Sequence, residues 1–521
     1  MSEKKPAAKK KTAKKPERKK FYLTTAIAYT NGPPHMGHTY QFTVADTIAR
    51  WHRTKGEDVF FLTGTDEYGM KLKKTAEKLG KTPEELTNEN TEKFKELDNL
   101  MNISFDIFNR TTDKQAHWPT AQKIWRLLSE SGDIYKKKYS GLYCYGCESF
   151  KTEREIVNGL CPEHQRAPEV FEEENYFFRL SKYTKKISKL IEDSEILLVP
   201  ETRKQEALNI LKEIDDISFS RSTAALKWGI PVPDDESQVI YVWCDALTNY
   251  LSGIGFISEP KKFRKYWPAD LHVLGKDNLK FHSIFWPAML LSAKLPLPKK
   301  IFVHGFVTSG GQKMSKSIGN VVDPFEMIKL YGAESLRYFL LREIPSGEDG
   351  DFTEEAFMQR VNSDLADNLG NLVNRSLVLA EKYSGGAIPK TDKQSFLKEK
   401  SEETIKKVDG HLEELKFHHA LEAIFSLSSD ANRYINETEP WKITEKEKLN
   451  EVLYNTLEAI RIISVLLYPF MPQTAERIAE QLGVKKDFSE KQLKWGLLKA
   501  GTKTKRGDVL FRKVMKVNLG E

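Results

Sequence analysis

The amino-acid sequence predicts an α/β fold with a parallel sheet, an insertion within that sheet and an all-helical C-terminal region. Near the N-terminus, short apolar runs alternate with turn residues and a helix-like pattern, an order typical of parallel sheets. Similar apolar runs return after a long gap. Beyond about residue 350 glycine becomes sparse and apolar residues take helical spacing, which predicts helices up to the C-terminus.

The first strand is expected within residues 21–29, FYLTTAIAY, because this β-prone run ends in the turn residues at 31–34. Residues 35–51 then predict a helix, and residues 58–67 predict a second buried strand. A strand, a turn, a helix and a second strand in this order open a parallel sheet.

Apolar runs at residues 239–242, 271–274 and 301–307 predict further strands, as if the sheet were interrupted and then resumed. The segment at about 130–225 between the two sets of strands is therefore expected to be an insertion.

The C-terminal third is expected to be a helical bundle. Ala420, Ile424, Leu427, Ala431 and Tyr434 follow one another at alternating steps of four and three, which places them on one face of a helix. Such a face is buried against other helices.

Length and composition exclude several classes of protein. A chain of 521 residues should hold about three domains. No apolar stretch approaches the roughly 20 residues needed to cross a bilayer, so no membrane association is expected. Four cysteines are too few for a disulfide framework, and the N-terminus lacks the apolar core of a secretory signal. A cytoplasmic location is therefore predicted.

The net charge of +7 is concentrated at the N-terminus. Residues 1–20 carry nine lysines and Arg18 against two glutamates, which is +8 and leaves −1 for the remainder. A Lys/Ala/Pro segment cannot bury enough apolar surface to fold, so a disordered arm that contacts phosphates is predicted. A solubilising extension and a transit peptide are the alternatives.

His35-Met36-Gly37-His38 is placed where the first strand gives way to the first helix. A helix N-terminus offers backbone N–H groups to an anion, and two imidazoles one turn apart add uncharged donors for phosphate oxygens. Gly37 leaves room for a flat base. Two surface histidines beside a turn are the alternative.

A second motif, TSGGQKMSKS at residues 308–317, follows a predicted strand. Its glycines allow the backbone to close over a triphosphate, and Lys313 and Lys316 can neutralise the charge of departing pyrophosphate. The spacing of a Walker A loop is absent there. A solvated surface loop is the alternative.

Cys144-x2-Cys147 and Cys161-x2-His164 are two chelating pairs separated by thirteen residues. Three thiolates and one imidazole can close a tetrahedral site and favour zinc over magnesium or calcium. Because all four ligands come from protein, a single structural Zn²⁺ is predicted. Three unpaired thiols are the alternative.

HMGH and KMSKS, in this order and on these elements, resemble the two signature motifs of class I aminoacyl-tRNA synthetases. Within that class, the stretch from Phe21 to about Gly483 is similar to the methionyl-tRNA synthetases. The resemblance implies a Rossmann-type catalytic domain, a connective insertion with a zinc knuckle, and an all-α anticodon-binding bundle. The implied boundaries are 1–20 for the arm, 21–129 and 226–325 for the catalytic domain, 130–225 for the insertion, 326–368 for a stem-contact region and 369–521 for the bundle.

The resemblance also implies roles for individual residues. His35, His38, Lys313 and Lys316 would be catalytic, and the ATP contacts would be these four with Gly37, Gly275 and Asp277. The methionine pocket would consist of Ile27, Tyr29, Asp66, Trp243, Ala246, Tyr250 and His282, with Asp66 receiving the substrate ammonium. Aromatic residues hold a polarizable thioether well, although core packing remains the alternative for any one of them.

Arg221 matches an arginine near the catalytic centre. Asn278 departs from the family, which usually has an aliphatic residue there. Asn371, Arg375 and Trp441 resemble the residues that read the CAU anticodon; Asn and Arg four apart share a helix face, and Trp can stack on a splayed base.

The implied activity is methionine–tRNA ligation. The methionine carboxylate attacks the α-phosphate of Mg²⁺-ATP, and the adenylate then passes methionine to the terminal adenosine of tRNA(Met), including the initiator tRNA, at its 2′-hydroxyl first. A monomer is expected. Synthetases for Leu, Ile or Val carry a larger insertion, and the enzyme for Cys places zinc at its substrate site. A binding protein without activation and a nucleotidyltransferase are the alternatives from other classes.

Overall fold

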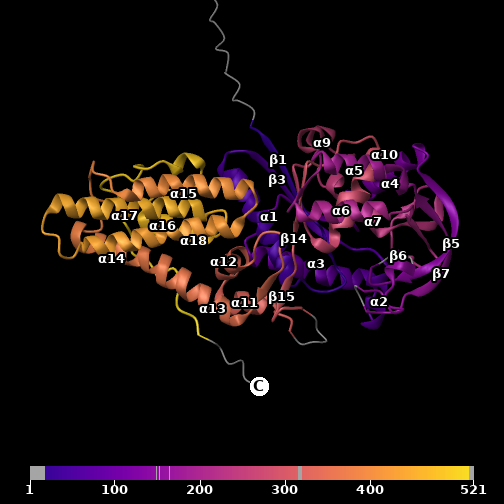
Figure 1. The fold of residues 1–521 in the computed structure, drawn as a ribbon, viewed down its shortest axis with the longest axis horizontal. Helices are drawn as coiled ribbons and strands as arrows, with labels where there is room; N and C mark the ends of the chain where they lie inside the picture. Colours follow the sequence, from indigo (N-terminus) through magenta and orange to yellow (C-terminus); the bar gives the residue numbers. More distant parts are fainter. Residues whose placement is uncertain (1–17, 148, 152, 163–164, 315–319, 516–521) are drawn as a thin grey trace, which may run out of the picture.

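The computed structural model describes residues 18–147, 149–151, 153–162, 165–314 and 320–515. The molecule is elongated: a helical bundle forms one end, a sheet and its helices lie in the middle, and a long antiparallel ribbon forms the other end (Figure 1). The helices that precede the bundle are α1 (Met36–Thr54), α2 (Met70–Lys78), α3 (Pro83–Leu100), α4 (Trp118–Glu130), α5 (Thr184–Glu192), α6 (Thr202–Lys212), α7 (Val242–Leu247), α8 (Asn249–Ser252), α9 (Pro260–Tyr266), α10 (Trp286–Ser292), α11 (Pro324–Tyr331), α12 (Ala333–Glu343) and α13 (Glu354–Arg360).

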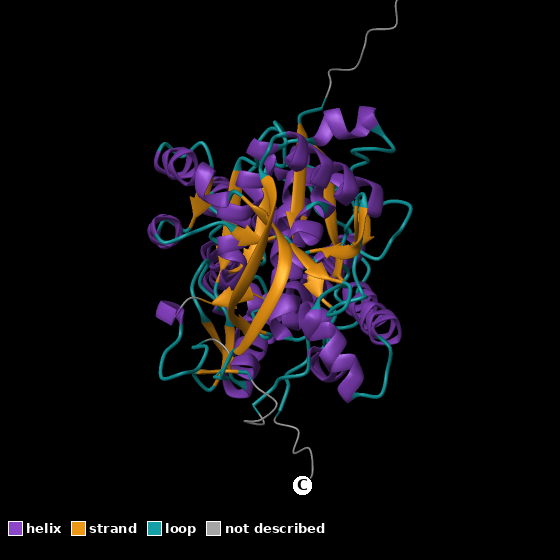
Figure 2. Cartoon of the chain, turned by 90° about the vertical axis from the view of Figure 1, so that its right-hand side faces the viewer, coloured by secondary structure: helices purple, strands orange, loops and turns teal. Residues whose placement is uncertain are grey.

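The central sheet is entirely parallel, as predicted. Its strands run in the order β2-β3-β1-β13-β14-β8, with β4 also paired to β3. Figure 2, in which the end with the antiparallel ribbon faces the viewer, shows strands in the middle of the molecule and helices around them. Burial on both faces explains why the strands read as continuous apolar runs. The strands are β1 (Lys20–Thr25), β2 (Ala28–Tyr29), β3 (Asp58–Asp66), β4 (Ile107–Arg110), β8 (Leu197–Val199), β13 (Leu271–Gly275) and β14 (Lys300–His304).

One predicted strand of this sheet is wrong. The run at 239–242 does not join it: β12 (Asp235–Ile240) pairs antiparallel with β10 (Ser220–Ser222) and β11 (Pro231–Val232), and the chain then enters α7. The edge position beside β14 is instead taken by β8, which comes from within the segment expected to be an insertion. A short apolar run does not specify its partner, because pairing is decided by residues distant in sequence.

The ribbon at the far end is a four-stranded antiparallel sheet in the order β6-β5-β7-β9. Its strands are β5 (Ile134–Cys144), β6 (Ser149–Lys151), β7 (Glu169–Phe178) and β9 (Ile217–Ser218). It carries the cysteine-containing turns between β5 and β7, so these cysteines lie away from the central sheet.

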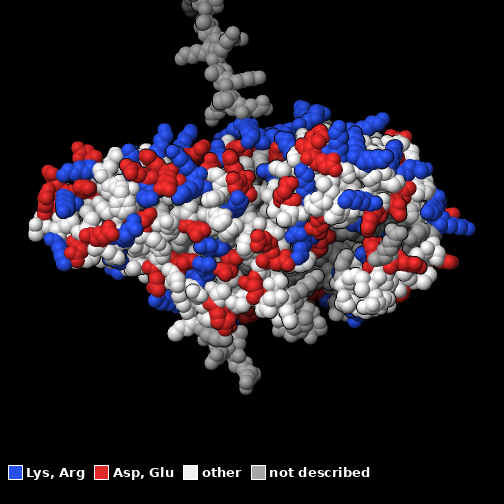
Figure 3. Space-filling view, in the orientation of Figure 1, with Lys and Arg blue, Asp and Glu red and all other residues white. Residues whose placement is uncertain are grey.

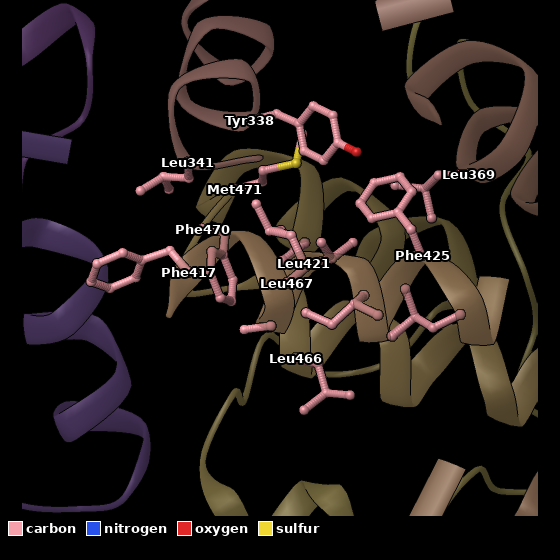
Figure 4. Packing of buried hydrophobic residues seen from close by; sticks show 14 of the residues in the cluster. Tyr338, Leu341, Leu369, Phe417, Leu421, Phe425, Leu466, Leu467, Phe470 and Met471 are labelled. Carbon is pink, nitrogen blue, oxygen red and sulfur yellow. The ribbon is translucent and has the colours of Figure 1, made fainter. Parts of the chain in front are cut away.

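The C-terminal bundle contains α14 (Asn371–Ser384), α15 (Phe396–Glu413), α16 (Phe417–Thr438), α17 (Lys446–Leu467) and α18 (Pro472–Leu482). The predicted apolar face of α16 is confirmed, since all five of its residues are buried. Its core continues into α12: Tyr338 and Leu341 pack against Phe417, Leu421 and residues of α17 (Figure 4). Each buried Leu or Phe contributes about 1.5–3 kcal/mol, so the bundle and the central sheet are firmly joined.

Helix α1 passes between the sheet and α12 and is buried on almost every side. Its Asp46 pairs with Arg50 at 2.8 Å and with Arg337 of α12 at 2.7 Å. Arg337 also donates to the carbonyl of Phe470, at the turn between α17 and α18. These buried charges tie the helix that begins with the HMGH motif to the bundle.

Lys, Arg, Asp and Glu side chains are interspersed over the face shown in Figure 3, as expected for a body with a charge near zero. Among the residues that the structure describes, no helix has both the length and the apolar character needed to cross a bilayer.

Candidate functional site

The two histidines of HMGH cap the first turn of α1. His35 is the N-cap residue and its Nδ1 accepts from the backbone N–H of Gly37 at 3.1 Å. His38 Nδ1 accepts from the backbone N–H of His35 at 3.2 Å, and the two rings stack with centroids 3.8 Å apart. The helix N-terminus is therefore partly capped by the motif itself, which differs from the expectation of freely available N–H groups.

This capping fixes the chemistry that both rings can offer. Because each Nδ1 accepts a backbone proton, a neutral ring carries its own proton on Nε2 and can donate it to a ligand oxygen. Burial, together with the neighbouring His35 and His304, holds the pKa of His38 well below its usual range. His38 is therefore an uncharged donor at neutral pH.

The loop after β13 contains the two predicted ribose contacts. Gly275 ends the strand, and a Cβ there would approach the Asp277 carboxylate to 2.8 Å and the His304 ring to 3.4 Å. Asn278 directs its side-chain amide toward the carboxylate of its neighbour Asp277 at 3.4 Å. Its backbone carbonyl lies 3.0 Å from His282 Nδ1.

The lysine motif begins on a hairpin after β14, formed by β15 (Val307–Ser309) and β16 (Gln312–Lys313). Its two turn residues, Gly310 and Gly311, have φ of +62° and +72°, as a type I′ turn requires. The backbone of Lys313 lies on β16; its side chain and the whole of Lys316 lie outside the described residues.

The predicted methionine pocket contains a buried hydrogen-bonded pair. Tyr250 Oη lies 2.6 Å from His282 Nε2, and His282 Nδ1 lies 3.0 Å from the carbonyl of Asn278. The carbonyl can only accept, so the ring proton is on Nδ1 and Nε2 accepts from the tyrosine hydroxyl. Burial lowers the pKa of His282 to about 4 and raises the pKa of Tyr250, so both groups are neutral at physiological pH.

Other predicted pocket residues lie around this pair. Trp243 stacks on Phe281, next to His282, with ring centroids 3.6 Å apart. Ala246 lies on the same helix, α7, and is buried; Ile27 is half-buried and packs against the same apolar cluster as Trp243.

Asp66 ends β3 and is paired in register with Tyr29 of β2. The next residue, Glu67, is fully buried, and its carboxylate accepts from Thr65 and Thr91 and pairs with Arg110 at 2.8 Å. These bonds hold the end of the strand and so fix the position of Asp66. Arg110 and Tyr68 line a cleft of about 510 Å³ that contains none of the predicted site residues.

Helix α7, which carries Trp243 and Ala246, is anchored by a buried hydrogen bond at Asp245. His117 Nε2 lies 2.6 Å from Asp245 Oδ1, and both side chains are buried. Burial raises the pKa of Asp245, partly offset by His117. The sequence did not indicate this pair, since the two residues are distant along the chain.

Arg221 is enclosed by protein groups. Its guanidinium donates to Ser218 and to the carbonyl of Ser220, and lies over the rings of Tyr143 and Tyr241. It therefore links the antiparallel ribbon to the segment that leads into α7.

Cys144, Cys147 and Cys161 come together in the turns of the ribbon. Their sulfur atoms all lie within 4.8 Å of one another, and this is the one group of potential ligands found among the described residues. Three thiols so close, without a disulfide, form a donor set that suits a soft metal ion. The fourth predicted ligand, His164, lies outside the described residues.

A polar pocket of about 330 Å³ lies at the other end of the molecule, in the bundle. It is formed by a π-helical stretch at Val361–Gly370, by α14 and by α16. We call it the bundle pocket; its lining consists of Ser363, Asp367, Asn368, Asn371, Arg375, Ser429, Asn432 and Asn436.

The bundle pocket contains two of the three predicted recognition residues, Asn371 and Arg375, and Arg375 donates to Asn436 at 2.8 Å. Asn432 donates to Asn368 at 3.1 Å. These partners were not predicted, although Asn432 and Asn436 are four residues apart on one helix face. Trp441 lies beyond the end of α16 with 45% of its surface exposed, and it does not line the pocket.

Two family descriptions match the chain. "tRNA synthetases class I (M)" matches residues 21–167 and 163–377, and "Anticodon binding domain of methionyl tRNA ligase" matches residues 384–520. Together they cover most of the chain after the Lys-rich arm.

Curated relatives agree. The methionine–tRNA ligase of Caldanaerobacter subterraneus subsp. tengcongensis is 47% identical over 95% of this chain and 79% of its own length. That of Brucella suis is 42% identical over 90% of this chain and 93% of its own. Among solved structures, Mycobacterium tuberculosis methionyl-tRNA synthetase in complex with methionyl-adenylate is 41% identical, with a TM-score of 0.91 over 95% of this chain and 99% of that one.

Proposed function

The chain belongs to the class I methionyl-tRNA synthetase family, and from this premise we propose which of its residues carry each part of the reaction. It is a methionine–tRNA ligase. It joins L-methionine to AMP at the expense of ATP, releases pyrophosphate, and transfers methionine to the 3′-terminal adenosine of tRNA.

The topology of the sheet carries the proposal. Strand β1 leads through β2 and α1 to β3, which pairs with β1 on one side, while β13 and β14 lie on the other side of β1. In open parallel sheets, ligands bind at the carboxyl edge where the strand order reverses. HMGH, the Gly275–Asp277 loop and the lysine hairpin all follow strands that end at this edge.

We assign the phosphate contacts to His35, His38, Lys313 and Lys316, and the ribose contacts to Gly275 and Asp277, with Gly37 beneath the base. The two imidazoles donate from Nε2 without adding charge, and the lysines neutralise the departing pyrophosphate. ATP enters this site as its Mg²⁺ complex. The protein supplies positioning and electrostatic stabilisation, and no covalent enzyme intermediate is needed.

Asp66 receives the methionine ammonium, and the apolar residues of the pocket surround its thioether. Neutral Tyr250 and His282 present no charge to the sulfur. Trp243 offers a rigid aromatic face, because it is stacked on Phe281. Arg221 supports this centre from the ribbon side.

Zn²⁺ would be held by Cys144, Cys147 and Cys161, with His164 as the fourth ligand. The ion would close the turns of the ribbon and serve a structural purpose. The bundle pocket and Trp441 would read the CAU anticodon of tRNA(Met), including the initiator tRNA, because clustered amides match the edges of unstacked bases. A monomeric state and a cytoplasmic location stay predictions.

Amino-acid-dependent ATP–pyrophosphate exchange with all twenty amino acids tests the pocket assignment. Exchange with methionine alone is expected; exchange with a different amino acid would contradict the proposed pocket. For the HMGH motif, His38→Ala should slow single-turnover adenylate formation much more than it weakens methionine binding. An unchanged rate of adenylate formation would contradict the role given to His38.

A further inference from the structure

A short strand from outside the predicted catalytic halves contacts both ATP-binding loops. Strand β17 (Gly350–Phe352) pairs in parallel with β15, with Thr308 opposite Asp351. Two aspartates lie here, Asp349 just before the strand and Asp351 within it.

Asp351 holds the lysine hairpin at its turn. Its Oδ1 accepts from Thr308 Oγ1 and from the backbone N–H of Gly311, each at 2.8 Å. Gly311 is one of the two left-handed turn residues, so this carboxylate fixes the turn that immediately precedes Lys313.

Asp349 holds the ribose loop in the same way. Both of its carboxylate oxygens accept from Lys276 Nζ, at 2.8 and 2.7 Å, and Lys276 lies between Gly275 and Asp277. Oδ1 also accepts from the N–H of Phe306, the residue just before β15.

The backbone around these bonds is closely packed. A Cβ at Gly305, just before the hairpin, would meet the Glu348 carbonyl oxygen at 2.1 Å and the Asp349 nitrogen at 2.5 Å. Little room is left for the strand to shift relative to the hairpin. Strand β17 then continues through α13 and the π-helical stretch into α14, which carries part of the bundle pocket.

We propose that Asp349 and Asp351 are positioning residues for adenylate formation, and that β17 sets the ribose loop and the lysine hairpin relative to each other. This inference rests on the proposed roles of those two loops. Asp351 acts on the phosphate end of ATP through the hairpin turn. Asp349 acts on the nucleoside end through Lys276.

If this inference is correct, variants of Asp351 and Asp349 should change different kinetic constants; we call this the crossed pattern. Asp351→Ala should raise the KM for pyrophosphate in the reverse reaction and lower the rate constant of adenylate formation, each about tenfold, because a charge-assisted bond and a second bond are lost. It should leave inhibition by adenosine, which has no phosphates, within about twofold. Asp349→Ala should weaken adenosine inhibition about fivefold and leave the KM for pyrophosphate within about twofold.

Matched variants separate positioning from general stability. Asp351→Asn keeps an oxygen that can accept both bonds and should restore most of the activity. Thr308→Val removes one hydrogen-bond donor to Asp351 without changing the shape of the side chain. It should change the same two kinetic constants as Asp351→Ala in the same direction, by about threefold. Thr308→Val therefore also tests the inference if Asp351→Ala does not fold. Glu348→Gln removes the charge of an exposed neighbouring acid and should have no effect.

Wild-type exchange with methionine is measured first, because its absence would contradict the proposed function and not this inference. If the wild type is active, two results would overturn the inference. One is that each variant changes the inhibition constant for adenosine and the KM for pyrophosphate equally, and the other is that neither variant changes either constant. A crossed pattern with an unchanged KM for methionine would support it.

Discussion

Replacement of Arg337 by methionine should destabilise the protein by about 3–5 kcal/mol, because it removes one of the two arginines that pair with a buried carboxylate. Arg337 is fully buried, and its guanidinium lies 2.7 Å from Asp46. It also donates to the carbonyls of Met101, Pro469 and Phe470, at 3.0, 3.2 and 2.7 Å. Methionine fills a similar volume, so the loss is mainly electrostatic and not a cavity effect.

The magnitude depends on what remains around Asp46. Its carboxylate keeps Arg50 at 2.8 Å and the N–H and hydroxyl of Ser104, at 2.8 and 2.6 Å. These contacts place the expected cost at the lower part of the range. The three freed carbonyls add to the cost, because unsatisfied buried acceptors cost about 1–3 kcal/mol each unless water reaches them.

Urea unfolding followed by circular dichroism would measure the change, with linear extrapolation to water. Asp46→Asn and the double variant complete a thermodynamic cycle. The double variant should be more stable than the sum of the single effects predicts, since neither charge is then left unpaired. As a control, Arg433→Met removes an exposed pair with Asp430 and should cost less than about 1 kcal/mol. A loss below 1 kcal/mol for Arg337→Met, or an additive cycle, would refute the reasoning.

Three further predictions concern the sites. The pKa of His282 is lowered from 6.5 to about 4 by burial, so its contribution to stability is complete above pH 6.5 and is lost as the pH falls toward 4. Between pH 7 and 5 the wild type should therefore lose about 2 kcal/mol more unfolding free energy than His282→Gln, and parallel pH profiles would contradict this. Cys161→Ser should abolish the zinc content measured by atomic absorption and lower the unfolding temperature, whereas Cys244→Ser should leave the zinc content unchanged; full zinc in the Cys161 variant would rule out the proposed site. Asn432→Ala should raise the KM for tRNA about tenfold and leave ATP–pyrophosphate exchange unchanged, because it removes an amide from the bundle pocket only. Asn450→Ala, on α17 outside the pocket, is the matched control, and equal effects of the two variants would contradict a role in recognition.

Features that depend on short stretches of chain could be predicted from the sequence. Residues 35–51 indicated α1, and the face formed by Ala420 and its neighbours on α16 is buried as expected. The cysteines of the ribbon could be grouped from their spacing, and their sulfur atoms do lie together. In each case the sequence pattern and the structure that it predicts lie in the same short segment, so local geometry is enough for the prediction.

Pairings between distant segments could not be predicted in this way. The apolar run at 239–242 and the apolar strand β8 are both short, yet only β8 joins the central sheet, whereas the first residues of the run end the antiparallel strand β12. The contacts of Asn278, whose side-chain amide lies toward Asp277 and whose carbonyl accepts from His282, could likewise not be predicted. The direction of a side chain depends on a backbone whose course is set elsewhere in the fold.

The sequence by itself determined the fold class, the two signature motifs HMGH and KMSKS and the family resemblance, because these depend on residue type and close spacing. Only the tertiary structure decided how the motifs are held: the Arg337–Asp46 pair beside α1, the two aspartates at β17, and the amides of the π-helical stretch, α14 and α16 that form one pocket. The physical reason is that buried charges and hydrogen bonds are satisfied by partners that are near in space but remote along the chain.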